Sequence, residues 1–227
     1  MLNFAMVLSG CGKEDGSDVW EVVLLSYFLS KKGAIPLFFA PDWEQKEVSD
    51  HLTKTVSPDS RNVLKESARI AGEAIRDVSA LSGKDVDALI LPGGEGMIKN
   101  LSDMVGEPKY DYLKPKPELQ RIIREIYRRK KPIGACGVAA LVVASALREI
   151  LDTPLTLTIG KDPQLIQQVE GLGAFNVLSR GAEVVIDSEH KLVTTPARLL
   201  KLKLVETALS LENLIDGIIE LTSSKPN

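Results

Sequence analysis

Cys136 is the residue of this chain whose neighbours are most typical of a chemical role. It follows the apolar run 132–135 directly. Gly137 and a stretch of small, helix-compatible residues come after it. This order is typical of a nucleophile elbow, in which a reactive side chain lies on a sharp turn between a strand and a helix. A thiol there faces the positive end of the helix dipole and should ionise more readily than a buried one. The alternative is a small buried hydrophobe, as most free cysteines are.

Two further loops carry residues suited to the same pocket. Gly93 and Gly94 follow an apolar run, and without Cβ atoms they can direct backbone N–H groups, together with that of Gly137, at an oxyanion. The alternative for this segment is a simple tight turn. Cys11 follows the first apolar run of the chain. Because ligands of open parallel sheets bind beyond the carboxyl ends of the strands, we expect the loops at Cys11, Gly94 and Cys136 to border one pocket.

The elements that position these loops follow from hydrophobic periodicity. Apolar runs alternate with segments of helical period, which predicts βαβ units, a mainly parallel sheet and the α/β class. Residues 182–195 alternate around a polar turn, which predicts a C-terminal β-hairpin. We expect strands at 3–8, 35–40, 87–91 and before Cys136, helices at 17–32, 61–74, 118–131 and within 198–221, and loops at 42–60 and 109–117. No repeat or linker interrupts the sequence, so we expect a single domain spanning 1–227.

Composition and charge exclude several function classes. The chain has 227 residues, 44% hydrophobic and 26% charged, and its net charge of −3 gives no basic field for nucleic acid or an anionic membrane. Its first apolar run is too short for a membrane span and lacks the features of a signal peptide, which predicts a cytoplasmic protein. Two cysteines and two histidines without metal-binding spacing predict neither a metal site nor a cofactor.

Five segments of the chain resemble one protein family, in the same order. The segments are Ser9-Gly10-Cys11-Gly12, residues 61–70, Leu91-Pro92-Gly93-Gly94-Glu95-Gly96, residues 99–103 and Val193-Thr194-Thr195-Pro196-Ala197. On these segments, the sequence from about residue 3 to residue 221 is similar to ElbB-like proteins, the "enhancing lycopene biosynthesis" branch of the ThiJ/PfpI superfamily. The family's name refers to an effect on isoprenoid biosynthesis and identifies no substrate.

This resemblance implies a fold and a pair of site residues. It implies a flavodoxin-like three-layer sandwich related to class I glutamine amidotransferases, usually a homodimer, with an elbow cysteine and a glutamate from the first long helix. Cys136 corresponds to the elbow cysteine and Glu21 to the glutamate. A carboxyl group in a poorly solvated crevice tends to stay protonated, so Glu21 suits proton transfer beside a thiol. An exposed carboxylate near a helix start is the alternative for Glu21.

Departures from the family pattern limit the reactions that we expect of this chain. The residue after Cys136 is Gly137 where protease-like members have a histidine, and no His-x-Glu pair follows as in amidotransferases. The chain is therefore expected to be neither a Cys-His protease nor a glutamine amidotransferase. Near relatives have a histidine after the Gly-Leu-Gly segment, where this chain has Asn176. Asn176 either hydrogen-bonds a substrate oxygen in the pocket or caps a loop.

Two functional hypotheses remain open. In the first, the chain is a cofactor-independent, glyoxalase-like enzyme: Cys136 adds to the aldehyde of a small 2-oxoaldehyde, and Glu21 moves a proton between its two carbons. In the second, it is a redox-responsive or regulatory stress protein in which Cys136 is oxidised and Cys11 offers a resolving thiol. The expected partners are a small aldehyde or carbonyl compound and a second copy of the chain, without nucleic acid or membrane.

Overall fold

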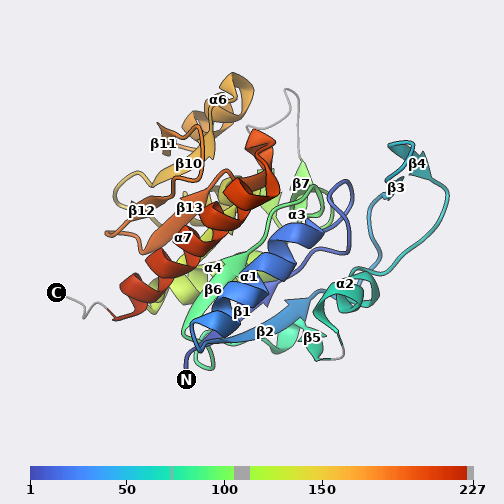
Figure 1. The fold of residues 1–227 in the computed structure, drawn as a ribbon, viewed down its shortest axis with the longest axis horizontal. Coiled ribbons are helices and arrows are strands. Elements are labelled where there is room, and N and C mark those ends of the chain that lie inside the picture. The colour runs from blue at the N-terminus through green and yellow to red at the C-terminus, as the bar shows by residue number, and fades with distance from the viewer. Residues whose placement is uncertain (73, 105–112, 224–227) are drawn as a thin grey trace.

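A seven-stranded sheet forms the centre of the protein (Figure 1). The computed structural model describes residues 1–72, 74–104 and 113–223. The strand order is β12-β13-β9-β6-β1-β2-β5, with parallel pairs from β13 to β5 and an antiparallel β12–β13 pair. The strands are β1 (Asn3–Val7), β2 (Ile35–Ala40), β5 (Ile75–Asp77), β6 (Ala88–Leu91), β9 (Ile133–Cys136), β12 (Val185–Asp187) and β13 (Leu192–Thr195). The predicted parallel sheet and C-terminal hairpin are therefore confirmed.

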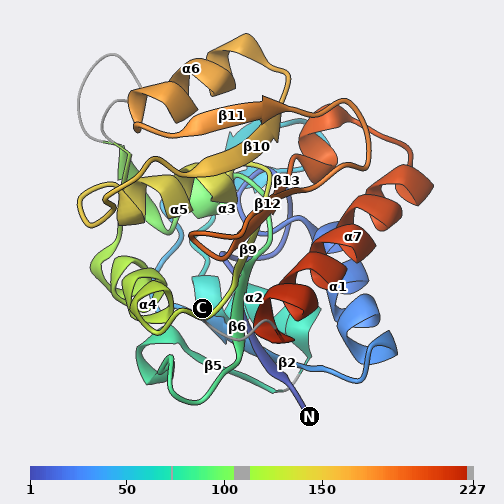
Figure 2. The same cartoon turned by 90° about the vertical axis from the view of Figure 1, so that its left-hand side faces the viewer.

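Helices cover both faces of this sheet (Figure 2). One layer contains α1 (Val19–Lys31), α2 (Val63–Ala71) and α7 (Leu204–Ser223). The other contains α3 (Gly96–Lys99), α4 (Pro117–Arg128) and α5 (Ala139–Leu147). The fold is thus the predicted flavodoxin-like α/β sandwich of three layers. Within the described ranges, no helix is long and apolar enough to cross a membrane.

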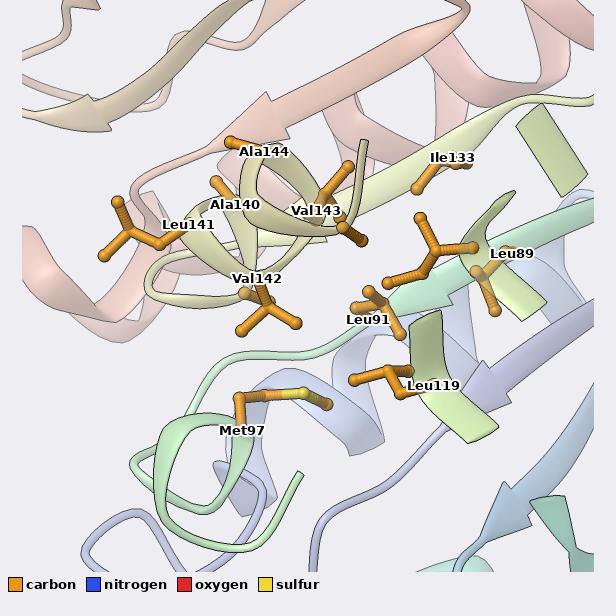
Figure 3. Close-up of a cluster of buried hydrophobic side chains, with 14 of the residues drawn as sticks. Leu89, Leu91, Met97, Leu119, Ile133, Ala140, Leu141, Val142, Val143 and Ala144 are labelled. Carbon is orange, nitrogen blue, oxygen red and sulfur yellow. The ribbon is translucent and has the colours of Figure 1, made fainter. Parts of the chain in front are cut away.

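The core beneath α5 fixes the start of that helix. Leu89, Leu91 and Ile133 project from the sheet toward α5, and Met97 and Leu119 close the cluster from α3 and α4 (Figure 3). Every residue of α5 is buried, which is expected of a helix that is apolar on all sides. Because α5 is enclosed in this way, the turn that joins it to β9 is held in place.

Smaller units are attached to the sandwich. β10 (Thr156–Gly160) and β11 (Phe175–Leu178) form a parallel pair with α6 (Pro163–Gly171) between them in the chain. β3 (Val48–Asp50) pairs with β4 (Thr55–Ser57), and β7 (Ser102–Met104) pairs with β8 (Leu113–Pro115). The 3-10 helices are η1 (Val78–Ala80) and η2 (Ala197–Leu200).

Two segments that the sequence predicted as loops contain the strands β3, β4 and β8, so these loop predictions are wrong in part. The expected loop 42–60 contains the β3–β4 hairpin, and 113–115 of the expected loop 109–117 form β8. Residues 109–112 lie outside the described residues. Three-residue strands are too short to show an alternating pattern, so the sequence carried no periodic signal for them.

Helix α1 begins and ends at recognisable signals. Asp18 caps its first turn, because its Oδ1 accepts the backbone N–H of Trp20 at 3.0 Å. The helix ends at Lys31, and Gly33 then adopts a left-handed φ of +73°. The predicted helix 17–32 is therefore confirmed with each end shortened, and its first turn carries Glu21.

Candidate active site

The loops after β1 and β6 meet at the carboxyl edge of the sheet. The N–H of Glu95 donates to the carbonyl of Lys13 at 2.7 Å, and the N–H of Asp18 donates to the carbonyl of Gly93 at 2.8 Å. A Cβ atom added to Gly94, whose φ is +115°, would lie 2.2 Å from the carbonyl oxygen of Gly16. Only glycine fits there, because a side chain would separate the two loops.

Glu21 reaches from α1 into this junction. Its side chain is 2% exposed. Oε2 accepts the N–H of Gly93 at 2.7 Å, and Oε1 accepts the N–H of Arg198 at 3.3 Å. Burial, followed by the negative charge of Asp18, raises the pKa of Glu21 to about 7, against the lowering effect of the two N–H donors. Glu21 therefore exchanges a proton readily near neutral pH.

Asp18 and Arg198 form the rim beside Glu21. Arg198 Nε donates to Asp18 Oδ2 at 3.0 Å, and the Arg198 guanidinium lies 4.1 Å from the centroid of the Trp20 ring. These contacts hold η2 against the start of α1. The sequence gives no signal that Arg198 lies beside Asp18, because the two residues are 180 positions apart in the chain.

Cys136 lies on strand β9 and not on the turn. Side chains alternate along a strand, so Cys136 shares the face of Gly134, whose added Cβ would contact Ile218 of α7. Its side chain is 0% exposed and belongs to the apolar cluster beneath α1 and α7. The left-handed backbone of the elbow occurs one residue later, at Gly137, with a φ of +54°. The predicted position of Cys136 on the turn is therefore wrong.

Burial also reverses the predicted acidity of the thiol. It raises the pKa of Cys136 well above its ordinary value, and the negative charges of Glu21 and Asp18 raise it further. Within the described part of the chain, no hydrogen bond joins Glu21 to Cys136. The expectation of a readily ionised thiol is thus wrong, because desolvation outweighs any effect of the helix dipole.

Two of the three proposed oxyanion donors are already engaged. The N–H of Gly93 donates to Glu21, and the N–H of Gly137 donates to the carbonyl of Thr195 at 2.8 Å. Among the hydrogen bonds of the described residues, none has the N–H of Gly94 or Val138 as its donor. These two groups border the crevice and are the better candidates.

The crevice beside Glu21 is almost closed. Its volume is about 10 Å³, which is room for about one water molecule. A Cβ atom added to Gly137 would lie 3.3 Å from Leu199 Cγ, so Leu199 covers the place where an elbow side chain would project. Lys13, Glu95 and Arg198 also line the opening.

Cys11 and Asn176 do not line this crevice. Cys11 is partly buried in the loop after β1, where burial raises the pKa of its thiol. Asn176 lies on β11; its Oδ1 accepts the N–H of Ile159 at 2.9 Å, and its Nδ2 donates to the carbonyl of Gly160 at 3.3 Å. The expectation that Asn176 approaches the pocket is wrong, because its amide joins β10 to β11. No group of three His, Cys, Asp or Glu side chains in the described ranges could hold a metal ion.

The three-layer fold, with an elbow between β9 and α5 beside a buried glutamate, is that of class I glutamine amidotransferase-like proteins. No family model matches the chain. The human protein "glutamine amidotransferase-like class 1 domain-containing protein 3, mitochondrial" is 35% identical over 228 residues, covering 96% of this chain and 82% of that protein. The "ES1 protein homolog, mitochondrial" of Rattus norvegicus is also 35% identical, covering 96% and 83%.

A solved structure agrees with these relatives. The isoprenoid biosynthesis protein with amidotransferase-like domain from Ehrlichia chaffeensis is 32% identical, with a TM-score of 0.88, and the match covers 96% of this chain and 99% of that one. The chain therefore belongs to the ES1 and ElbB-like family of amidotransferase-like proteins in the ThiJ/PfpI superfamily. Glyoxalase III from Candida albicans, at 15% identity and a TM-score of 0.60, shares the fold. The predicted cytoplasmic location stays a prediction, because the human and rat relatives are named mitochondrial.

Proposed function

We propose that this protein binds a small carbonyl compound non-covalently at Glu21 and does not use a cysteine nucleophile. The observation that carries this proposal is the elbow itself: the left-handed position is Gly137, which has no side chain. The neighbouring thiol of Cys136 faces the core and is 0% exposed. A thiol in that position has no path to a ligand in the crevice.

The crevice offers complementary groups for such a ligand. In its protonated form, Glu21 can donate a hydrogen bond to a carbonyl oxygen, and the N–H groups of Gly94 and Val138 can donate to the same oxygen. Lys13 at the opening can pair with a second oxygen or a carboxylate of the ligand, whereas Arg198 is held by Asp18. Since the crevice holds about 10 Å³, the side chain of Leu199 has to move when the ligand enters.

Pyruvate is a suitable binding probe, because it combines a ketone with a carboxylate. We expect saturable binding to the parent protein and to Cys136→Ala, and binding at least about tenfold weaker to Glu21→Gln, by calorimetry at pH 6. Intact-mass measurement should detect no covalent adduct. The absence of binding to the parent protein, or a covalent adduct that Cys136→Ala abolishes, would overturn the proposal.

A second candidate is slow glyoxalase-like turnover, which the pKa of Glu21 near 7 favours. In this reaction, water adds to the aldehyde to form a hydrate, in place of the thiol of Cys136. The ionised Glu21 removes the C1 proton of a 2-oxoaldehyde hydrate, and the C–H electron pair forms an enediolate whose charge rests on the C2 oxygen. Glu21 then returns the proton to C2, a proton of one C1 hydroxyl passes to the C2 oxygen, and the product is a 2-hydroxy acid formed without any cofactor.

Methylglyoxal and a lactate assay test this second candidate. We expect lactate formation that Glu21→Gln abolishes and Cys136→Ala retains. Lactate formation no faster than the uncatalysed rate would exclude this second candidate. An equal loss of lactate formation in both variants would show that the thiol of Cys136 takes part in the reaction.

An oxidation-responsive role at Cys136 has less support. The thiolate is the species that peroxide oxidises, and both the burial and the raised pKa of Cys136 oppose it. Cys11 is less buried, but its pKa is raised as well. The homodimer implied by the family stays a prediction.

A further inference from the structure

A cavity of about 410 Å³ lies at the end of α5 opposite to the elbow. This volume is within the range of about 300–1,000 Å³ that is typical of small-molecule sites. The cavity shares no lining residue with the Glu21 crevice. Its walls come from the end of α5, the connection 151–155 to β10, and the segment 170–174, which contains the end of α6 and its connection to β11.

The floor of this cavity is apolar. Ala144, Leu155, Leu172 and Ala174 line it, and each of them is at most 5% exposed. These side chains come from three separate segments that the core holds in place. Such a floor suits an aliphatic group of a few carbon atoms.

The rim of the cavity carries charges of both signs. Arg148, Asp152 and Glu170 line it and are exposed. None of the three makes an ion pair or side-chain hydrogen bond in the described part of the chain, although opposite charges commonly pair at a protein surface. The rim therefore presents one cation and two anions that are available to a ligand.

The two helix ends at the cavity add partial negative charge to its rim. The C-terminal turns of α5 and α6 both contribute lining residues. The carbonyl end of a helix carries a partial negative charge, which favours a cation such as an ammonium group. Arg148 offers a planar guanidinium that suits a carboxylate.

Thr153 anchors this rim to the rest of the protein. Its hydroxyl donates to Glu189 Oε1 at 2.7 Å and lies 3.1 Å from His190 Nε2. His190 Nδ1 in turn lies 2.9 Å from Asp187 Oδ2. These contacts attach the rim segment to the β12–β13 hairpin. The segment is therefore ordered before a ligand binds, which lowers the entropic cost of binding.

We propose that this cavity binds a free amino acid with an aliphatic side chain. The side chain rests on the apolar floor, the carboxylate pairs with Arg148, and the ammonium lies near Asp152, Glu170 and the two helix ends. The site is independent of the function proposed at Glu21, and no covalent step is involved.

L-Leucine is the probe, with two analogues that each lack one charge. 4-Methylpentanoate lacks the ammonium, and isoamylamine lacks the carboxylate. We expect calorimetry to show leucine binding with a Kd on the order of 1 mM or tighter, and at least about tenfold weaker binding of both analogues. Arg148→Gln should weaken leucine binding about tenfold and leave the amine unaffected.

Arg128→Gln is the matched control, because Arg128 is an exposed arginine on α4 outside the cavity. It should bind leucine as the parent protein does. Chemical-shift changes in the amide spectrum should fall on residues 144–155 and 170–174. The proposal is overturned if millimolar leucine does not bind, if Arg148→Gln binds it as well as the parent does, or if the shifts occur elsewhere.

Discussion

Cys136 and Gly137 divide between them the two properties of a nucleophile elbow. Cys136 carries the thiol but occupies the last position of β9, with its side chain in the core. Gly137 carries the left-handed backbone, with a φ of +54°, but has no side chain to present. The position at which this fold can expose a nucleophile to the crevice therefore holds none.

The titration of Glu21 should make stability depend on pH. Its folded-state pKa of about 7 lies above the value of about 4.3 for an unfolded glutamate. The contribution of the protonated form is therefore fully present below about pH 4.3 and is lost as pH rises to about 7. The expected loss is about 1.4 kcal/mol per pH unit, or about 4 kcal/mol in all.

Glu21→Gln isolates this effect, because glutamine does not titrate. Urea denaturation should give a difference in unfolding free energy, variant minus parent, that is constant below pH 4 and rises between pH 4.5 and pH 7. A difference that stays flat across this range would mean that Glu21 is not raised in pKa.

Asp18→Asn should lower the pKa of Glu21. Asparagine caps a helix as well as aspartate does, so the variant removes the charge while it keeps the cap. The loss of a neighbouring anion favours ionisation of Glu21, and Arg198 is then no longer neutralised by Asp18. Carbon-detected NMR titration of the Glu21 carboxyl measures the change.

Asp162→Asn is the control for that change, since Asp162 caps α6 in the same way. It should leave the Glu21 titration unaltered. An unchanged midpoint in Asp18→Asn would show that burial alone sets the pKa of Glu21.

Gly137→Cys should create the reactive thiol that the parent protein lacks. In a Cys11→Ser, Cys136→Ala background, the new thiol faces the crevice at the start of α5, and its pKa should fall below about 8.5. We expect alkylation by iodoacetamide at pH 7 at least about tenfold faster than that of Cys136 in Cys11→Ser. The left-handed backbone should cost about 1–2 kcal/mol of stability. A new thiol as inert as Cys136 would refute the assignment of the elbow to residue 137.

Leu199→Ala should open the crevice. The leucine is partly exposed, so its truncation should cost about 1 kcal/mol of stability, less than for a fully buried leucine. Pyruvate should bind several-fold more tightly, because no side chain has to be displaced from Gly137. Leu200→Ala is the matched control, since Leu200 lies against Gly160 and not against the elbow. Equal affinities in the two variants would show that Leu199 does not close the crevice.

The fold was predictable because its strands are unusually apolar and its glycines stand where strands end. Residues 88–91 and 133–136 form continuous buried runs, which is typical of parallel strands covered on both faces. The small antiparallel pairs and the β10–α6–β11 unit were not predicted. The strands of the antiparallel pairs are too short to show an alternating pattern. The β10–β11 pair depends on contacts between separate segments, such as those of the Asn176 amide with Ile159 and Gly160.

The site was predicted to within one residue at the elbow. Glu21 and the double glycine line the crevice. The end of an apolar run indicated the place of the double glycine, whereas Glu21 was indicated by the family resemblance. The stretch from Ala135 to Val138 consists of small residues throughout, so the sequence does not indicate which of them adopts a positive φ. Strand alternation from Ile133 was the one usable signal, since it directs Cys136 to the face beneath α7. The position of Arg198 at the site is set by tertiary contacts alone, so the sequence did not indicate it.

The most direct test of the central claim is the alkylation rate of Cys136 in the native protein, measured by peptide mass spectrometry in a Cys11→Ser background. We predict negligible modification from pH 6 to pH 9 in native conditions, and a rate that rises in low urea in step with global unfolding. Rapid modification of the folded protein, with a pH midpoint below the free-thiol value of about 8.5, would contradict the account and make Cys136 the nucleophile.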